Sequence, residues 1–441
     1  MRIIIDLQGA QTESRYRAIG RYSLSLAKAI ISNSGQHEVL IVLNGLFQDS
    51  IPYIRSELAN LLPSENIHVW HALGPVNDSD VNNQWRRETA ELIREAFIKS
   101  LKPDVIHIPS FFEGYIDNAV TSILLFDKET PISVTMLDLI PLLNAEHYLA
   151  PNPLYKQHYL RKIDQLKSAT KLFAISESAR QEALKNLPFK SQDVVHQSIA
   201  IEPFFKNLNI NKHEYYIRRL ALGISKPFVL YTGGADSRKN LPALIKAYAA
   251  LSLELRAEHQ LVFAGRIPEG NIEQLRQLAE QAGLAPEELY LTGFVSDSEL
   301  VELYNLCELF VFPSWHEGFG LPVLEAMACG APAIAANTSS LPEVIGIAEA
   351  LFCPFSEFDM SNKINLALTD VGYKKKLKEN GLKQVKNFSW DTVSKKAIKS
   401  FEDMQSAYPI SAYKSPETIY KEISAKLEAS YPADLSREDC M

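Results

Sequence analysis

Short apolar runs typical of β-strands alternate with helical patterns along most of this chain, and that alternation restricts the fold more than any other feature. A first series of strand-like runs lies at 2–7, 38–44, 66–70, 104–109, 133–137 and 172–176. A second series lies at 227–234, 259–265, 289–295, 309–314, 331–337 and 350–354. Strands that alternate with helices form parallel sheets covered by helices on both faces. The sequence therefore predicts two doubly wound α/β domains, whose ligand sites at the carboxyl ends of the strands face each other across a cleft.

The domain boundaries follow from this pattern. We expect an N-terminal domain over 1–205 and a C-terminal domain over 206–388, with the charged stretch 206–226 as the connection. A helical run follows at 389–405. The tail, 406–441, contains another helical stretch, and the sequence leaves its role open.

Composition excludes several classes of protein. The chain has 441 residues, of which 46% are hydrophobic, and its net charge of −8 argues against nucleic acid as a partner. Its four cysteines lack zinc-like spacing, no signal peptide is evident, and no apolar run approaches ~18 residues. We therefore expect a cytoplasmic protein without a metal site. Peripheral contact with the inner face of a membrane stays open, because a basic cluster could bind anionic lipid or be a solvated helix face: Lys374, Lys375, Lys376 and Lys378.

Two glutamates lie eight residues apart around a glycine-rich turn. Glu317 and Glu325 flank the sequence Gly-Phe-Gly-Leu-Pro, which follows the strand-like run 309–314 and precedes a helical run. Glycines at 318 and 320 allow a ligand to approach the backbone, and the N–H groups of a helix start favour phosphate. We expect Pro322 at the first helical position. The arrangement suits a long ligand with a diphosphate at its middle and hydroxyl groups at both ends.

A second glycine turn carries two basic residues. Gly233 and Gly234 end a strand-like run, and Arg238 and Lys239 follow just before a helix. Arginine as a fork and lysine as a point charge can neutralise a diphosphate. A solvated helix start with incidental basic residues is the alternative.

The segment from Glu317 to Glu325 resembles the signature of retaining glycosyltransferases with the GT-B fold, of family four (group 1). The resemblance covers roughly residues 1 to 405 and is strongest over 227–346. It implies two Rossmann-like domains, and a helix over 389–405 that crosses back onto the first. In that family the first glutamate contacts the transferred sugar and the second holds the ribose of the nucleotide.

The resemblance also implies the remaining site residues. The catalytic group would be Glu317, Arg238, Lys239 and Asp138, without a metal ion or cofactor. The sugar-nucleotide donor would bind at Gly20, Gly233, Gly234, Arg238, Lys239, Arg266, Phe294, Val295, Glu317, Gly318, Phe319, Gly320, Leu321 and Glu325. Of these, Arg266 could reach the diphosphate or be an ordinary surface arginine. The backbone near Val295, in a loop that caps a helix starting at Glu299, would contact the base.

The first domain would hold the acceptor. A glycine loop before a helix includes Gly20, and the acceptor-side residues would be Arg21, Tyr22, Phe112, Tyr115 and Asp138. Stacking on acceptor sugars and packing in the core are both open for the aromatic loop at 111–115. The chain departs from the family at Leu137, where a histidine often contacts the donor sugar.

Residues 5–30 most resemble bacterial mannosyltransferases of cell-surface polysaccharide assembly. This implies that the chain transfers mannose from GDP-mannose, with retention of configuration, to a growing lipid-linked glycan. Three alternatives stay open: a transferase that uses a UDP-sugar, a GT-B scaffold that binds a sugar nucleotide with little or no turnover, as Leu137 suggests, and a same-fold epimerase or phosphorylase. The sequence leaves the oligomeric state undetermined.

Overall fold

The computed structural model describes residues 1–16, 18–410 and 412–429, and it divides the chain into two compact units. The first contains Met1–Ile175, Arg180–Gln197 and the chain from Trp390 onward; the second contains Ser176–Ala179 and Ser198–Ser389. The chain therefore enters the second unit at residue 198, whereas the sequence indicated residue 206. The end of the predicted tail, 430–441, lies outside the described residues.

The first unit is built on a sheet of seven parallel strands in the order β3-β2-β1-β4-β5-β6-β7. The strands are β1 (Arg2–Asp6), β2 (Glu38–Asn44), β3 (Ile67–Trp70), β4 (Val105–Ile108), β5 (Ile132–Met136), β6 (Lys171–Ala174) and β7 (Val194–His196). Six of them coincide with the predicted runs. The seventh, β7, has only three residues, too few to form a recognisable pattern.

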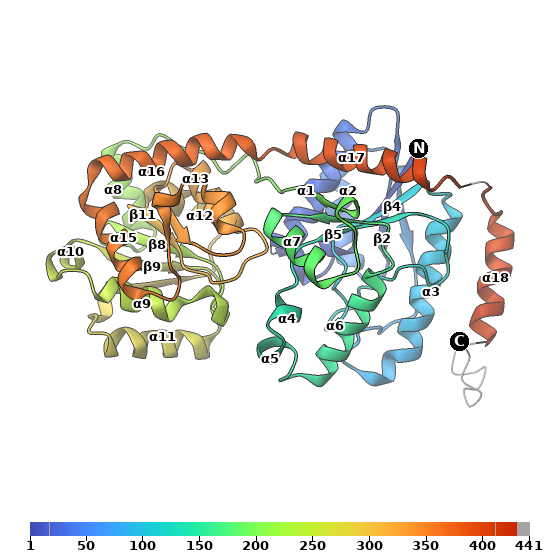
Figure 1. The fold of residues 1–441 in the computed structure, drawn as a ribbon, viewed down its shortest axis with the longest axis horizontal. Helices are drawn as coiled ribbons and strands as arrows, with labels where there is room; N and C mark the ends of the chain where they lie inside the picture. The colour runs from blue at the N-terminus through green and yellow to red at the C-terminus, as the bar shows by residue number, and fades with distance from the viewer. Residues whose placement is uncertain (17, 411, 430–441) are drawn as a thin grey trace. The chain divides into compact units, whose positions relative to one another are not determined.

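The helices of the first unit connect these strands and cover the sheet (Figure 1). They are α1 (Ala18–Asn33), α2 (Ile51–Leu58), α3 (Gln84–Ser100), α4 (Ile140–Leu143), α5 (Ala145–Tyr148), α6 (Pro153–Leu166), α7 (Glu177–Asn186), α17 (Trp390–Ala407) and α18 (Pro416–Ala429). The first residues of α7 belong to the second unit.

Two of these helices come from the C-terminal part of the chain. Helix α17 runs beside α1 (Figure 1), where Asn33 Nδ2 donates a hydrogen bond to Ser394 Oγ at 3.0 Å. Helix α18 lies against α3 and buries Ile419 and Ile423 beside Leu92 and Ala96. The described part of the tail is therefore a packed element of the first unit.

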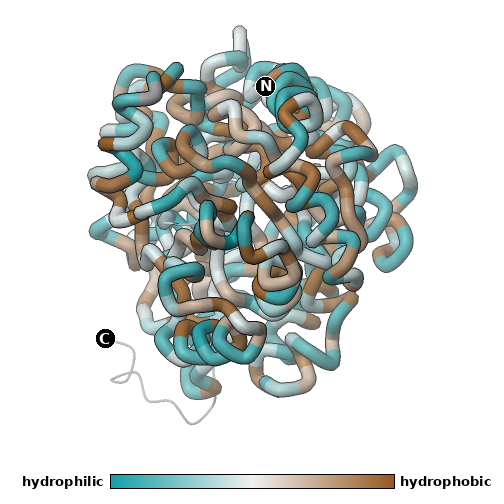
Figure 2. The backbone as a smooth tube through the Cα atoms, turned by 90° about the vertical axis from the view of Figure 1, so that its left-hand side faces the viewer, coloured by the Kyte–Doolittle hydropathy of each residue, from teal (hydrophilic) through white to brown (hydrophobic). Residues whose placement is uncertain are grey.

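The second unit has six parallel strands in the order β10-β9-β8-β11-β12-β13. They are β8 (Phe228–Thr232), β9 (Gln260–Ala264), β10 (Leu289–Gly293), β11 (Leu309–Phe312), β12 (Ala333–Ala336) and β13 (Leu351–Phe352). Every residue of β8, β9, β11 and β12 is buried, as expected for parallel strands covered on both faces. In Figure 2 hydrophobic stretches accordingly run through the interior, and hydrophilic residues lie on the outer helical turns.

The helices of the second unit are α8 (Lys212–Ala221), α9 (Leu241–Ala249), α10 (Leu253–Glu258), α11 (Glu269–Gln281), α12 (Asp297–Leu306), α13 (Leu321–Ala328), α14 (Leu341–Ile345), α15 (Glu357–Thr369) and α16 (Val371–Gln384). Helix α8 lies inside the stretch predicted as a connection. Asn211 and Glu214 form a capping box that starts it, and Arg218 pairs with Glu302 of α12 at 2.9 Å. The stretch is therefore part of the second unit.

Each sheet has one place where the strand order reverses. In the first sheet β1 lies beside β4, and in the second β8 lies beside β11. The loops that follow two such strands diverge and leave a crevice at their carboxyl ends, where ligands of doubly wound folds bind. These two switch points are where functional side chains should be sought.

Candidate functional site

At the switch point of the second sheet, three charged residues of the two glycine turns meet. Arg238 and Lys239 follow β8, and Glu317 follows β11. The carboxylate of Glu317 accepts hydrogen bonds from Arg238 Nη1 at 2.8 Å, Lys239 Nζ at 2.5 Å and Ser314 Oγ at 2.6 Å. The structure thus brings together three of the four residues to which the sequence assigned a catalytic role.

Backbone contacts hold the two turns against each other. Asp236 caps the short 3-10 helix Ser237–Lys239, and the carbonyl oxygen of Arg238 accepts hydrogen bonds from Trp315 N and Ser314 Oγ, both at 2.9 Å. Asn240 takes the left-handed conformation, φ +58°, and its side chain donates to the carbonyl oxygen of Pro313 at 3.2 Å. The charged side chains are therefore presented from a rigid double turn.

The electrostatics of this cluster are coupled. Burial raises the pKa of Glu317, but the charges of Lys239 and Arg238 outweigh it and hold that pKa below its usual value. Burial lowers the pKa of Lys239 more than Glu317 restores it. Asp236 lies further from the guanidinium of Arg238, at 3.6 Å, and is more exposed. The two cations share one buried carboxylate, so an anionic ligand would find them already positioned.

Glu325, on the second turn of α13, belongs to a buried polar chain that the sequence did not reveal. Its Oε2 accepts a hydrogen bond from the hydroxyl of Tyr304 at 2.9 Å, and that hydroxyl lies 2.8 Å from Thr232 Oγ1. Burial raises the pKa of Tyr304 well above its usual value. Spacing could not have indicated Tyr304, because it comes from α12, which reads as an ordinary amphipathic helix.

The glycine turn itself is built as predicted, with one difference at the helix start. Gly320 is the N-cap of α13 with φ +103°, and a Cβ there would lie 2.6 Å from Leu341 Cδ2. Helix α13 begins at Leu321, so Pro322 takes the second position instead of the first. Gly318 is buried in the same turn. The side chain of Phe319 is only 4% exposed and packs edge-on against Phe388, so it faces the core.

The other donor-side residues lie at the same edge of the second sheet. Gly233 has φ +141°, which favours glycine. A Cβ on Gly265 would lie 2.4 Å from the carbonyl oxygen of Gly233, so the loop after β9 needs glycine as well. Gly234 accepts a hydrogen bond from the hydroxyl of Tyr231 at 2.8 Å. Arg266 is exposed after β9.

The loop after β10 carries a solvent-exposed aromatic side chain. Phe294 is 77% exposed and Val295 is half-buried. Helix α12 starts at Asp297, with Ser296 as N-cap, and not at Glu299, which is the third residue of the helix and pairs with Ser296 in a capping box.

The first unit changes the expectation for the glycine loop at 20–22. Helix α1 already begins at Ala18, so Gly20, Arg21 and Tyr22 lie within it. A Cβ on Gly20 would lie 2.3 Å from Arg15 Cα, so this glycine serves packing against the 3-10 helix Glu13–Tyr16. Tyr22 is 2% exposed and its hydroxyl lies 3.0 Å from Thr135 Oγ1, which places it in the core and not toward an acceptor. Arg21 is half-buried.

The aromatic loop after β4 packs onto α6. Phe112 stacks on Tyr159 with ring centroids 4.9 Å apart, and the hydroxyl of Tyr115 donates to Asn152 Oδ1 at 3.0 Å. Of the two readings of this loop, these contacts favour core packing. Asp138 is half-buried and accepts a hydrogen bond from Ile140 N at 3.0 Å at the start of α4, so its carboxylate has a structural role there.

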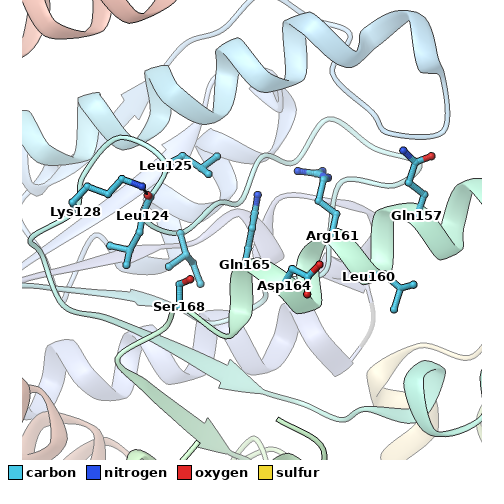
Figure 3. A pocket seen from close by; sticks show the side chains of 10 residues that line it. Leu124, Leu125, Lys128, Gln157, Leu160, Arg161, Asp164, Gln165 and Ser168 are labelled. Atoms are coloured by element: carbon cyan, nitrogen blue, oxygen red, sulfur yellow. Dashed lines mark hydrogen bonds between the residues drawn. The ribbon is translucent and has the colours of Figure 1, made fainter. Parts of the chain in front are cut away.

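A hollow of about 810 Å³ lies elsewhere in the first unit, between the 123–128 loop and α6 (Figure 3). Leu124, Gln157, Arg161 and Gln165 are among the residues that line it. Both lining segments lead into the amino ends of strands β5 and β6, so this hollow is not at a switch point.

Two features are absent from the described residues, a metal-binding cluster and a membrane-spanning helix. No group of three or more histidine, cysteine, aspartate or glutamate side chains there is arranged to hold a metal ion. None of the described helices combines the length and the apolar character that crossing a bilayer requires.

Comparison with known proteins agrees with this geometry. Residues 216–384 match the family described as Glycosyl transferases group 1. The chain is 37% identical over 402 residues to the serotype-specific mannosyltransferase WbdA of Escherichia coli, a match that covers 91% of this chain and 48% of that protein. It is 27% identical over 401 residues to the O-antigen chain mannosyltransferase B of Escherichia coli, covering 87% of this chain and 95% of that protein. The chain spans about half the length of the WbdA relatives.

Solved structures share the fold. The structure of Anabaena Alr3699/HepE in complex with UDP and glucose has a TM-score of 0.64 at 16% identity, covering 91% of this chain and all of that one. WaaG, a glycosyltransferase involved in lipopolysaccharide biosynthesis, has a TM-score of 0.62 at 15% identity, covering 91% of this chain and 99% of that one. Both comparisons establish the GT-B fold, with two parallel-sheet α/β domains.

Proposed function

We propose, from the premise that this chain belongs to the group 1 glycosyltransferases, that it transfers mannose from GDP-mannose to a hydroxyl group of a growing bacterial surface polysaccharide. In this proposal the reaction retains the anomeric configuration, and the acceptor is a lipid-linked glycan at the cytoplasmic face of the membrane. The names of the similar proteins support the sugar and the class of product, since both are mannosyltransferases and one acts on the O-antigen chain.

The observation that carries the proposal is the contact of Arg238, Lys239 and Glu317 at the switch point of the second sheet. A nucleoside diphosphate that leaves a sugar gains negative charge, and fixed cations in a partly buried site stabilise that charge. Arg238 and Lys239 can do so with their own side chains, so the proposal assigns the task to them and requires no cofactor. The helix start at Gly320 adds backbone N–H groups on the same edge.

Glu317 and Glu325 have different tasks in this scheme. Glu317 orients the hydroxyl groups of the transferred sugar beside the cations, and it stays ionised because its pKa is lowered. Glu325 holds the ribose from the second turn of α13, in an orientation fixed by the hydroxyl of Tyr304. Positioning and charge stabilisation then account for catalysis, while the departing phosphate takes the proton of the acceptor.

The test is calorimetric titration of the wild type and of Glu325→Ala with GDP, UDP and ADP. We expect micromolar binding of GDP, weaker binding of UDP and ADP, and GDP binding weakened about tenfold or more in the variant. Tighter binding of UDP than of GDP would indicate that the donor is a UDP-sugar and not GDP-mannose. Failure to bind any of the three would refute a sugar-nucleotide site.

Turnover needs a separate measurement. Incubation with GDP-mannose and a mannose-terminated oligosaccharide should give an extended product, and the one-bond C1–H1 coupling in its NMR spectrum reports whether the new linkage retains the donor's configuration. Binding of GDP without product would instead indicate a scaffold, as the leucine at position 137 allows.

A further inference from the structure

The switch point of the first sheet holds a carboxyl group that belongs to none of the predicted site residues. Glu113 follows β4, and its carboxylate accepts hydrogen bonds from Ser110 Oγ at 3.0 Å, Ser14 Oγ at 3.3 Å and Thr12 Oγ1 at 3.4 Å. Thr12 and Ser14 come from the loop after β1, the neighbouring strand. Glu113 thus occupies the place in the first sheet that Glu317 occupies in the second.

This half-buried carboxyl group differs from the buried carboxylates of the first unit. Asp6 pairs with Arg94 at 2.6 Å, Asp127 with Lys99 at 2.9 Å and Glu91 with Arg161 at 2.5 Å. Glu95 forms no ion pair in the described residues, but it accepts hydrogen bonds from the backbone N–H groups of Phe126 at 2.6 Å and Asp127 at 3.1 Å. Within the described part of the chain, the side-chain partners of Glu113 are hydroxyl groups, and no lysine or arginine forms an ion pair with it. A carboxylate kept only for stability would be expected to have a cation or backbone N–H donors.

The electrostatic surroundings of Glu113 also indicate a carboxylate that lacks stabilising partners. Burial raises the pKa of Glu113, and the negative charge of Asp117 raises it further. The three hydroxyl donors only partly offset these effects, so additional hydroxyl donors would stabilise the carboxylate. The residue as a whole is half-buried.

The loops that carry the cluster are tightly fixed. A Cβ on Gly9 would lie 2.6 Å from Ser110 Cβ, so the loops after β1 and β4 touch directly. Gly114 has φ +98°, and a Cβ there would lie 2.3 Å from the carbonyl oxygen of Ala119. A carboxyl group held in this way is organised in advance for a ligand.

We propose that Glu113, with Thr12, Ser14 and Ser110, forms an acceptor subsite that binds neighbouring hydroxyl groups of the terminal sugar of a neutral glycan. The inference rests on the proposed function, because it assigns an acceptor contact to the same enzyme. The hydroxyl groups of Thr12, Ser14 and Ser110 donate their hydrogens to Glu113, so sugar hydroxyls would donate to the remaining lone pairs of the carboxylate and of these side-chain oxygens. Asp138, the carboxylate predicted for this task, already accepts a hydrogen bond from the backbone N–H of Ile140 at the start of α4.

The experiment compares Glu113→Gln and Ser110→Ala with a control, Glu129→Gln, which changes an exposed carboxylate in the same β4–β5 connection. The acceptor probe is methyl α-mannoside and the donor is GDP-mannose. Four quantities are measured: KM and kcat for the mannoside, the affinity for GDP, and saturation transfer from protein to mannoside in the presence of GDP. Thermal unfolding shows whether each variant is folded.

We expect Glu113→Gln to raise KM for the mannoside by about tenfold or more, the loss of roughly one hydrogen bond to a charged group. The kcat and the GDP affinity should change much less, and Ser110→Ala should show a smaller effect in the same direction. An unchanged KM, or an equal loss of GDP affinity, would overturn the subsite.

Failure of the proposed function gives a different pattern. If the wild type transfers no sugar, saturation transfer still decides: a mannoside signal that disappears in Glu113→Gln supports the subsite, and no signal with the wild type refutes it.

Discussion

Lys239 Nζ lies 2.5 Å from Glu317 Oε1, and this pair joins the turn after β8 to the turn after β11. Arg238 contacts the same oxygen atom at 2.8 Å. The carboxylate that the family resemblance assigns to the sugar therefore also neutralises the cations assigned to the diphosphate, so the donor must share them with Glu317.

Replacing Glu317 by glutamine should separate these two tasks. The variant leaves two partly buried cations without their anion, and we expect it to lose about 2–4 kcal/mol of stability. Because the cations are then free for phosphate, GDP affinity should be kept or increased, while transfer falls by about 100-fold or more. Calorimetry with GDP, a transfer assay and urea unfolding give the three values.

The pH dependence of that stability loss has a definite sign. The folded-state pKa of Glu317 lies below its usual value of 4.5, so its contribution to stability is present above pH 4.5 and is lost as the pH falls through the lowered pKa. The difference in stability between the wild type and Glu317→Gln should therefore shrink in acid. The exposed Glu273→Gln on α11 is the control, and a difference that grew in acid would contradict the assignment.

From the lowered pKa of Lys239 we expect GDP binding to weaken at alkaline pH. Burial lowers its pKa below the usual 10.5, so the ammonium loses its charge at a lower pH than an exposed lysine. GDP affinity should accordingly fall as the pH rises toward 10.5, and Lys239→Arg should keep its affinity to higher pH. Guanine also titrates in alkali, but equally for both proteins, so the ratio of the two affinities reports Lys239. A ratio independent of pH would show that the lysine does not contact the phosphates.

The sequence predicted the residues of this cluster because they lie in turns that directly follow strands. Arg238, Lys239 and Glu317 are read from local patterns, and parallel strand topology then brings them to one edge. Tyr304 could not be found in this way. It approaches Glu325 from a separate helix, and nothing local distinguishes it from a core tyrosine.

In the first domain the sequence predicted a ligand contact that the structure does not support. The motif around Gly20 looked like a ligand loop, but α1 begins two residues earlier, and the helix turns Tyr22 into the core. Glu113 lies within the aromatic segment 111–115, for which the sequence predicted stacking by Phe112 and Tyr115 and no role for the carboxylate. Its significance depends on the loop after β1, about a hundred residues away in sequence.

The contact between Tyr304 and Glu325 predicts how the ribose is recognised. If Glu325 binds the diol, the wild type should bind GDP about tenfold or more tightly than 2′,3′-dideoxy-GDP. Glu325→Ala should bind both weakly and equally. Tyr304→Phe removes one donor to a buried carboxylate and should reduce both the preference for GDP and the stability, the latter by about 1–2 kcal/mol. Equal binding of the two nucleotides by the wild type would remove Glu325 from the ribose.

The glycine turn makes a prediction that concerns stability alone. Gly320→Ala places a Cβ 2.6 Å from Leu341 Cδ2 at a residue with φ +103°, and both effects oppose folding. We expect it to lower the free energy of unfolding by about 2–4 kcal/mol, from the left-handed backbone and the overpacking together. Gly270→Ala, in α11, is the matched control, because nothing lies within 4 Å of its Cβ and its φ is not positive. Alanine there should raise stability by about 0.5–1 kcal/mol, since glycine is the weaker helix former. Urea unfolding of the two variants decides, and a loss at Gly270 as large as that at Gly320 would mean that the turn is not specially constrained.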